Sequence, residues 1–255
     1  MSSAVLRVVE REAIVFSRLW RASLFSSFVQ PTLYLAAMGL GLGGLIDRHG
    51  PVAGLDYLTF VTPGMLAASS MQLAAGESMW PVLVGAKWRR NFHAAVATPV
   101  SPGDVFCGLV IWIAVRAAIA GAAFLVVATL LGGIASPLGL LAVPAGVLGA
   151  IAFAAPLAAF AATQETDVVF PLIMRLGILP LFLFSGTFFP VTALPGWLRP
   201  ASYASPLWHA VELARAATTG HFHLTAAVLH IAVLAGFTGV GLIAGMRTFT
   251  VRLAP

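Results

Sequence analysis

The side chains that could carry catalysis are few, and their spacing does not assemble an enzyme. Ser185 with His209 or His230 would supply a serine and a base, but no serine lies in the G-x-S-x-G turn that presents a nucleophile. His221 and His223, in HFH, fall on the same side of an extended segment, and no third metal ligand is evident. We therefore predict no catalytic residue and no metal site, and that the chain is not an enzyme by itself.

The sequence also lacks the phosphate-binding loop of nucleotide-hydrolysing proteins. A phosphate loop needs G-x-x-x-x-G-K-[ST], and the one lysine of the sequence, Lys87, lies in GAKWRR. The single cysteine, Cys107, excludes an intrachain disulfide and a cysteine-based metal site. We predict no cofactor on this chain and no ATP hydrolysis by the phosphate-loop route.

The composition is that of an integral membrane protein. Of the 255 residues, 60% are hydrophobic and only 9% are charged, and the mean hydropathy is +0.97. Soluble domains carry about 25% charged residues, so this chain cannot cover a globule with polar surface. The net charge of +5 is not gathered into one basic face, so we predict no nucleic-acid partner.

Six apolar segments are long enough to cross a bilayer, which takes about 20 helical residues. A Gly/Pro turn, GGIASP at 132–137, divides the longest uncharged run into two of them. We predict an all-α fold with one transmembrane domain over 1–255 and six membrane helices, near 24–46, 58–81, 106–132, 138–163, 168–189 and 225–246.

The basic residues predict the orientation. Nine of the fourteen lie in the N-terminal segment, the second connection and the C-terminal tail, which six crossings place on one side. Basic connections stay in the cytoplasm, so we predict cytoplasmic termini and a multi-pass protein of the inner (cytoplasmic) membrane. The N-terminus lacks a basic region followed by a short apolar core and a cleavage site, so we predict no cleavable signal peptide.

Charged residues inside the predicted spans are costly in lipid and usually face protein or water. They are Glu77, Arg116 and Arg175. Glu77 and Arg116 lie toward the same side of neighbouring helices and are expected to pair, whereas Arg175 is near enough to its end to snorkel. We expect structural roles for all three rather than contact with a substrate.

The N-terminal segment, residues 1–23, has the pattern of an amphipathic helix in the inner membrane interface. Four arginines fall on one helical face: Arg7, Arg11, Arg18 and Arg21. This helix is either a lever that also contacts a cytoplasmic partner or a simple topology anchor.

The second connection, 84–105, is longer than a minimal turn between two helices. It begins with basic residues, ends with TPVSPGD, and is predicted to hold a short helix within 88–97 and a cap at Asp104. It is either a docking surface for a soluble partner or an ordinary positive-inside loop, and its length favours docking.

The apolar segment 185–220 is interrupted by Pro190, Pro195, Pro200 and Pro206, so no continuous helix survives. On the outer side, such a segment is either a re-entrant helical hairpin between the fifth and sixth spans or a plain loop; apolarity favours the hairpin. Within 206–220, His209, Glu212 and Arg215 form a polar stripe that we expect to be a solvated outer face.

Together, the basic N-terminal helix, the connection RRNFHAAVATPVSPGDVFCGLVIWIAVRA and the block SGTFFPVTALPGWLRPASYASPLWHAVELAR resemble the membrane subunit of ABC type-2 exporters. The likeness is to the branch of nodulation-factor (lipo-oligosaccharide) and drug-exporter permeases and covers essentially the whole chain. It implies a second permease, identical or homologous, and cytoplasmic ABC ATPase subunits that carry ATP and Mg, with membrane lipids around them.

The resemblance also implies roles for two groups of residues. The coupling helix that docks on the ATPase would include Lys87, Trp88, Arg89, Arg90, Asn91, Phe92 and His93. The outer gate would include Gly186, Phe189, Pro190, Pro195, Trp197, Pro206, Glu212 and Arg215.

We therefore expect a permease subunit that exports an amphiphilic substrate, such as a lipid-linked saccharide, a glycolipid or a drug. An ATP-independent secondary transporter is the alternative, but it predicts ion-binding residues within the membrane, and no acidic residue lies mid-span. An intramembrane enzyme is a further alternative.

Overall fold

The chain is mainly helical in the part that the structure, a computed structural model, describes: residues 3–254, without the side chains at 3, 19–28, 30, 31 and 40. In that part the β-structure is limited to one bridge, between Val52 and Leu55. The all-α prediction is confirmed. The α-helices are α1 (Ser3–Leu35), α2 (Gly43–Ile46), α3 (Tyr57–Leu83), α4 (Asn91–Val96), α5 (Pro102–Leu130), α6 (Ala142–Ala161), α7 (Phe170–Ile173), α8 (Leu179–Phe184), α9 (Arg199–Ala204), α10 (Pro206–Thr219) and α11 (Leu224–Arg252).

Three helices in the described residues are long and apolar enough to cross a membrane by length and composition. They are Pro102–Leu130, Pro137–Ala161 (α6 with the 3₁₀ turn before it) and Leu224–Leu253, and a shorter apolar helix covers Phe170–Phe184. These four correspond to the third, fourth, sixth and fifth predicted spans. The fifth ends earlier than expected, because α8 stops at Phe184. The count of six crossings stays a prediction.

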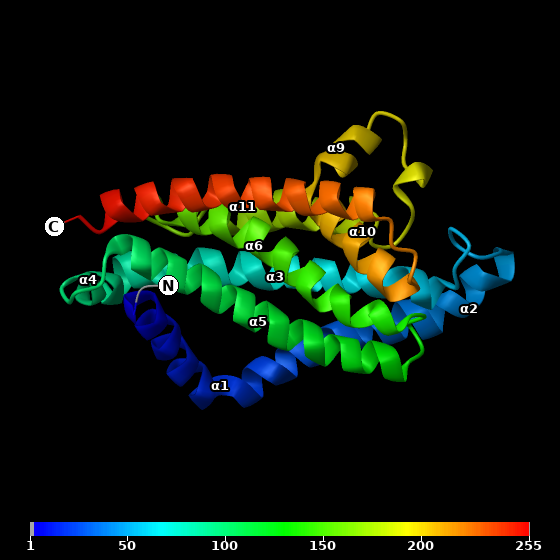
Figure 1. Ribbon diagram of the computed structural model, residues 1–255, viewed down its shortest axis with the longest axis horizontal. Coiled ribbons are helices and arrows are strands. Elements are labelled where there is room, and N and C mark those ends of the chain that lie inside the picture. The colour runs from blue at the N-terminus through cyan, green and yellow to red at the C-terminus, as the bar shows by residue number, and fades with distance from the viewer. Residues whose placement is uncertain (1–2, 255) are drawn as a thin grey trace.

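The first helix is longer than the predicted interfacial segment. α1 runs without interruption past position 23, and a π-helical stretch, Ala36–Leu42, continues it into α2. The ribbon of α1 bends between its N-terminal part and the part that follows (Figure 1). The interfacial segment and the first span are therefore parts of one helical rod.

α6 lies at the centre of the bundle and packs against α3, α5, α10 and α11. Small residues permit this close approach, as they do in other membrane helix pairs. A Cβ at Gly241 of α11 would lie 2.5 Å from the ring of Pro156 in α6, and one at Gly245 would lie 2.0 Å from Phe106 in α5. The Gly-x-x-x-Gly spacing of α11 therefore sets its contact with both neighbours.

The start of α5 is capped as predicted, but the N-cap residue is Ser101, and Asp104 lies at the third position of the helix. Ser101 caps the helix by accepting a hydrogen bond of 3.1 Å from the backbone of Asp104, and the Asp104 carboxylate accepts one of 3.0 Å from the backbone of Ser101. This reciprocal pair satisfies two amides that have no partner within the helix. The cap fixes where the 84–105 connection ends.

The prolines of 185–220 break the chain as predicted. Pro190 precedes a 3₁₀ turn, Val191–Ala193, and Pro206 opens α10. Pro200 lies in the first turn of α9, where its missing amide costs nothing. The segment is thus a series of short elements between α8 and α11.

The bundle has two distinct ends (Figure 1). Both termini and α4 lie at one, which we call the α4 end, and α2 lies at the other, with the N-terminal part of α11 turned toward it. The two termini therefore share an end, in agreement with an even number of passages.

Candidate functional site

The α4 end presents an exposed basic run between α3 and α4. α3 continues through a π-helical turn, Val84–Trp88, which places the side chains of Lys87, Trp88, Arg89 and Arg90 in contact with solvent. Trp88 is 55% exposed. A large aromatic side chain beside three cations, with so much of its surface uncovered, is typical of a surface that binds another protein.

The backbone of Arg90 is left-handed, with φ 51° and ψ 25°. A residue with a Cβ pays roughly 1–2 kcal/mol in this region relative to the right-handed one. The turn separates the basic run from α4, so α4 leaves the axis of α3 and forms its own element at the end of the bundle (Figure 1).

Phe92 anchors α4 to the bundle. Its side chain is 3% exposed, and its ring lies 6.1 Å from that of Phe249 in α11, which in turn lies 5.1 Å from Phe106 in α5. Gly85 makes room for the ring, since a Cβ there would approach it to 2.5 Å. The predicted coupling residues therefore divide into an exposed basic group and a buried anchor.

The other two members lie on α4 beside Phe92. Asn91 and His93 are partly buried, and the Oδ1 atom of Asn91 and the Nδ1 atom of His93 have no hydrogen-bond partner in the described structure. Burying polar atoms without partners is unfavourable. The two atoms are buried, so the packing of α4 against the bundle leaves two polar groups unsatisfied in the described structure.

The N-terminal half of α1 packs along α5. Val5 and Val8 are buried, and Val8 lies where a Cβ on Gly108 would be 2.6 Å away. Arg7 and Arg18 are exposed, as are the apolar side chains of Leu6, Ile14 and Val15. The amphipathic interfacial helix stays a prediction. The side chain of Arg21 lies outside the described residues.

Arg11 connects α1 to the coupling residues. It forms an ion pair with Glu12, and its guanidinium lies 6.0 Å from the centre of the Phe92 ring. This is cation–π distance. α1 and α4 therefore meet at Phe92. A displacement of α4 would change this contact with α1.

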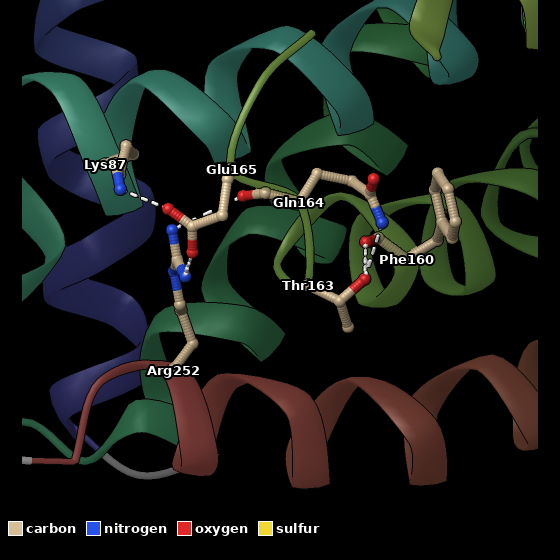
Figure 2. Close-up of polar contacts among 6 residues, drawn as sticks. All are labelled: Lys87, Phe160, Thr163, Gln164, Glu165 and Arg252. Carbon is tan, nitrogen blue, oxygen red and sulfur yellow. Dashed lines mark hydrogen bonds and ion pairs between the residues drawn. The ribbon is translucent and has the colours of Figure 1, made fainter. Parts of the chain in front are cut away.

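A carboxylate in the connection between α6 and α7 links two distant basic side chains. Figure 2 shows Glu165 between Lys87, at the end of α3, and Arg252, in the last turn of α11. Arg252 also donates a hydrogen bond of 3.3 Å to the carbonyl oxygen of Gln164. Hydrogen bonds from Arg252 and from Lys87 lower the pKa of Glu165 to about 2.

Of the three charged residues predicted within the membrane, two form a pair. Arg116 Nη2 of α5 lies 3.2 Å from Glu77 Oε1 of α3, which confirms the expected pair. The same guanidinium lies 4.7 Å from the centre of the Phe16 ring in α1. Arg175 lies apart from them, exposed on the π-helical turn Met174–Ile178 between α7 and α8.

Arg215 ties the outer segment to the bundle. Nη2 donates hydrogen bonds of 2.7 Å to the carbonyl oxygen of Gly186 and 3.4 Å to that of Phe60, and Nη1 pairs with Glu212. The guanidinium also lies 4.2 Å from the centre of the Phe60 ring. Three elements, α3, α10 and the turn after α8, therefore meet at one side chain.

The prediction that the 206–220 stripe is a solvated face is wrong. Only 13% of the Arg215 side chain is exposed, and His209 is buried. Nδ1 of His209 lies 2.8 Å from Nδ1 of His230 in α11. The stripe faces α3 and α11 because its polar groups find partners there, which an isolated helix pattern cannot reveal.

The other residues of the predicted outer gate differ in exposure. Gly186, with φ 80°, and Pro206 are buried, Phe189 and Pro190 are partly buried, and Pro195 and Trp197 are exposed. Ser185 donates a hydrogen bond of 3.0 Å to Ser205, which joins the two ends of the stretch between α8 and α10. Gly186 and Arg215 are in contact. The side chain of Trp197, in contrast, is 79% exposed and packs little against the bundle.

Three contacts were not predicted from the sequence. The bridge through Glu165 and the His209–His230 pair join residues far apart in the chain, and Arg199 donates hydrogen bonds of 2.9 and 2.6 Å to the carbonyl oxygens of Leu194 and Thr192. The one available signal was the single acidic connection, TQETD, at an otherwise basic end.

Comparison of the sequence with known proteins identifies the family of this chain. The family model described as ABC-2 type transporter matches residues 3–219. "Nodulation protein J" of Rhizobium meliloti (strain 1021) is 29% identical over 98% of this chain and 94% of its own length, and that of Rhizobium leguminosarum bv. trifolii is 32% identical over 85% and 81%. The "Inner membrane transport permease YadH" of Escherichia coli (strain K12) is 27% identical over 42% of this chain and 40% of its own length. With its matched region covering most of its helices, the chain belongs to the ABC-2 type transporter family.

Proposed function

We propose that this chain is the permease subunit of an ATP-driven exporter in the inner membrane. It crosses the membrane six times with both termini in the cytoplasm, pairs with a second permease, and is driven by separate ABC ATPase subunits that bind ATP and Mg. Its substrate is amphiphilic: a lipid-linked saccharide, a glycolipid or a drug. Family membership and the permease name of one relative support this proposal.

The distribution of charge supports the orientation. Basic residues gather at the α4 end: in the N-terminal half of α1, in the run that ends at Arg90, and in the last two turns of α11. Basic connections remain on the cytoplasmic side of a membrane. The α4 end is therefore the cytoplasmic end of the proposed exporter, and the segment between α8 and α11 lies outside.

The observation that carries the proposal is the construction of α4. A short helix lies at the end of the bundle, directly after a left-handed turn at Arg90 and the exposed basic run that ends there. Its Phe92 is buried and packs against Phe249 of α11. Force applied to such a helix passes through Phe92 to Phe249 and Phe106, and so to α11 and α5. This is the arrangement expected of a coupling helix.

The outer segment suits a gate. It is broken into short elements, carries exposed aromatic side chains such as Trp197, and is held to the bundle by Arg215. Irregular backbone at membrane depth is tolerated only where protein or water satisfies its polar groups. We propose that 185–220 forms the re-entrant hairpin that closes the outer side.

The test is to coexpress the chain with a candidate ABC ATPase, to purify the complex, and to measure ATP turnover in lipid nanodiscs. We expect copurification and a turnover that changes when the permease is present. Reversing Arg89 and Arg90 to Glu should abolish both effects and leave the permease folded. Arg48→Glu, a reversal of an exposed charge at the opposite end, is the matched control.

Two results would overturn the proposal. The first is a permease that never copurifies with the ATPase and leaves its turnover unchanged. The second is transport of an amphiphile into or out of vesicles without ATP, which would favour a secondary transporter. Equal loss of coupling in Arg48→Glu and in the double reversal would remove α4 from the docking surface.

A further inference from the structure

We propose that the groove between the end of α11 and the α6–α7 connection binds the phosphate group of an anionic phospholipid. The proposal rests on α11 crossing the membrane and not on coupling to ATP. It is therefore tested by lipid binding, and it can fail or succeed separately from the proposed function.

The groove has a volume of about 450 Å³ and combines cations with hydroxyl groups. Its lining is Ala162, Thr163, Arg247, Thr248, Val251 and Arg252. Two guanidinium groups offer the forked donors that match phosphate oxygens. Basic pockets between membrane helices on the cytoplasmic side are suited to phospholipid head groups.

The two arginines of the groove differ in whether they form an ion pair with an acidic side chain. Arg252 pairs with Glu165, which also pairs with Lys87 (Figure 2). Arg247 is exposed and takes part in none of the ion pairs found among the described residues. Lys87 and Arg252 share the one carboxylate of Glu165, so the positive charge of Arg247 in the groove is not offset by an ion pair in the described residues.

The adjoining surface of α11 favours a lipid over a free anion. Val240, Ile243, Arg247 and Val251 follow one another at helical spacing, so they share a face. The aliphatic members are 70%, 58% and 80% exposed. A cation near the end of an uncovered apolar stripe matches a phospholipid, whose chains would lie along Val240 and Ile243 while its phosphate reaches Arg247.

Occupancy of the groove would also act on Glu165. A phosphate that approaches Arg252 competes with the Glu165 carboxylate for the same guanidinium. Removing that carboxylate should therefore free Arg252 and strengthen lipid binding, whereas removing Arg247 should weaken it. Net charge alone predicts the same two signs, so the distinction between a specific site and general attraction comes from removing an equal charge far from the groove, at Arg48.

The experiment is to titrate the purified full chain, in a neutral detergent, with phosphatidylglycerol or phosphatidylcholine and to count bound lipids by native mass spectrometry. We expect phosphatidylglycerol to be preferred and Arg247→Gln to weaken its binding about fivefold. Glu165→Gln should strengthen it. Arg48→Gln, which removes an exposed charge at the other end, should leave it unchanged, and size-exclusion profiles check that each variant is folded.

Three results would overturn the proposal. A site that recognises net negative charge binds phosphatidylglycerol more tightly than zwitterionic phosphatidylcholine, so equal affinities for the two lipids contradict it. Equal losses in Arg247→Gln and Arg48→Gln would show charge attraction without a site. Displacement of the bound lipid by sodium phosphate at comparable concentration would show that the groove binds a free anion instead.

Discussion

The guanidinium of Arg215 donates a hydrogen bond of 2.7 Å to the carbonyl oxygen of Gly186, 29 residues earlier in the chain. Gly186 has φ 80°, a conformation that favours glycine, and directly follows the end of α8. This one contact fixes where the outer segment leaves the bundle. It links the stretch richest in prolines to α10, a helix that packs on α3 and α6.

Arg215→Ala should destabilise the protein by about 2–3 kcal/mol, because it removes charged hydrogen bonds and leaves the Gly186 carbonyl and Glu212 without their partner. The free energy of unfolding in mixed detergent micelles measures this effect. Arg199→Ala is the control, since Arg199 also donates to two carbonyls but is exposed. A loss at Arg199 equal to that at Arg215 would contradict the role given to burial.

The Glu77–Arg116 pair should show strong coupling between its members. Each single substitution, Glu77→Gln or Arg116→Gln, leaves the other charge without its 3.2 Å partner between α3 and α5. We expect the double variant to be about 1–2 kcal/mol more stable than the sum of the single losses predicts. Unfolding of all four proteins in micelles gives this value, and additive losses would show that the pair contributes nothing.

The Glu165 bridge should respond to acid in a defined window. Because folding lowers the pKa of this carboxyl from 4.5 to about 2, its contribution is complete above pH 4.5, decreases as the pH falls, and is lost near pH 2. The stability difference between wild type and Glu165→Gln should shrink over that range. It should also fall with added salt, because Glu165 is exposed. A difference independent of pH would contradict the bridge.

Glycine at two adjacent positions should have opposite effects on stability. Arg90 is left-handed, with φ 51°, so Arg90→Gly relieves strain and should stabilise the fold by about 1 kcal/mol. Arg89, with φ −90°, is right-handed, and Arg89→Gly should destabilise it by about 0.5–1 kcal/mol. Both lose one exposed charge, so charge is matched. Equal shifts in thermal unfolding would show that backbone strain is unimportant.

Much of the local structure could be predicted from the sequence. The short helix in the second connection, the breaks at the prolines and the Glu77–Arg116 pair all follow from nearby residues or from depth along neighbouring spans. The cap of α5 was predicted too, though at Asp104 instead of Ser101. Four arginines at helical spacing predicted an amphipathic N-terminal helix, and two of them, Arg7 and Arg18, are exposed. The number of crossings, the sidedness and the roles in coupling and gating remain proposals.

The sequence by itself determined that this is an apolar helical chain with basic residues concentrated in a few connections, since composition and helical periodicity depend on neighbouring residues alone. Only the tertiary structure decided that His209 is buried and that Arg215 is mostly covered. It also decided that Glu165 joins Lys87 and Arg252, which lie 78 and 87 residues away. Such contacts depend on which helix faces pack together, a property of the whole bundle that no single segment encodes.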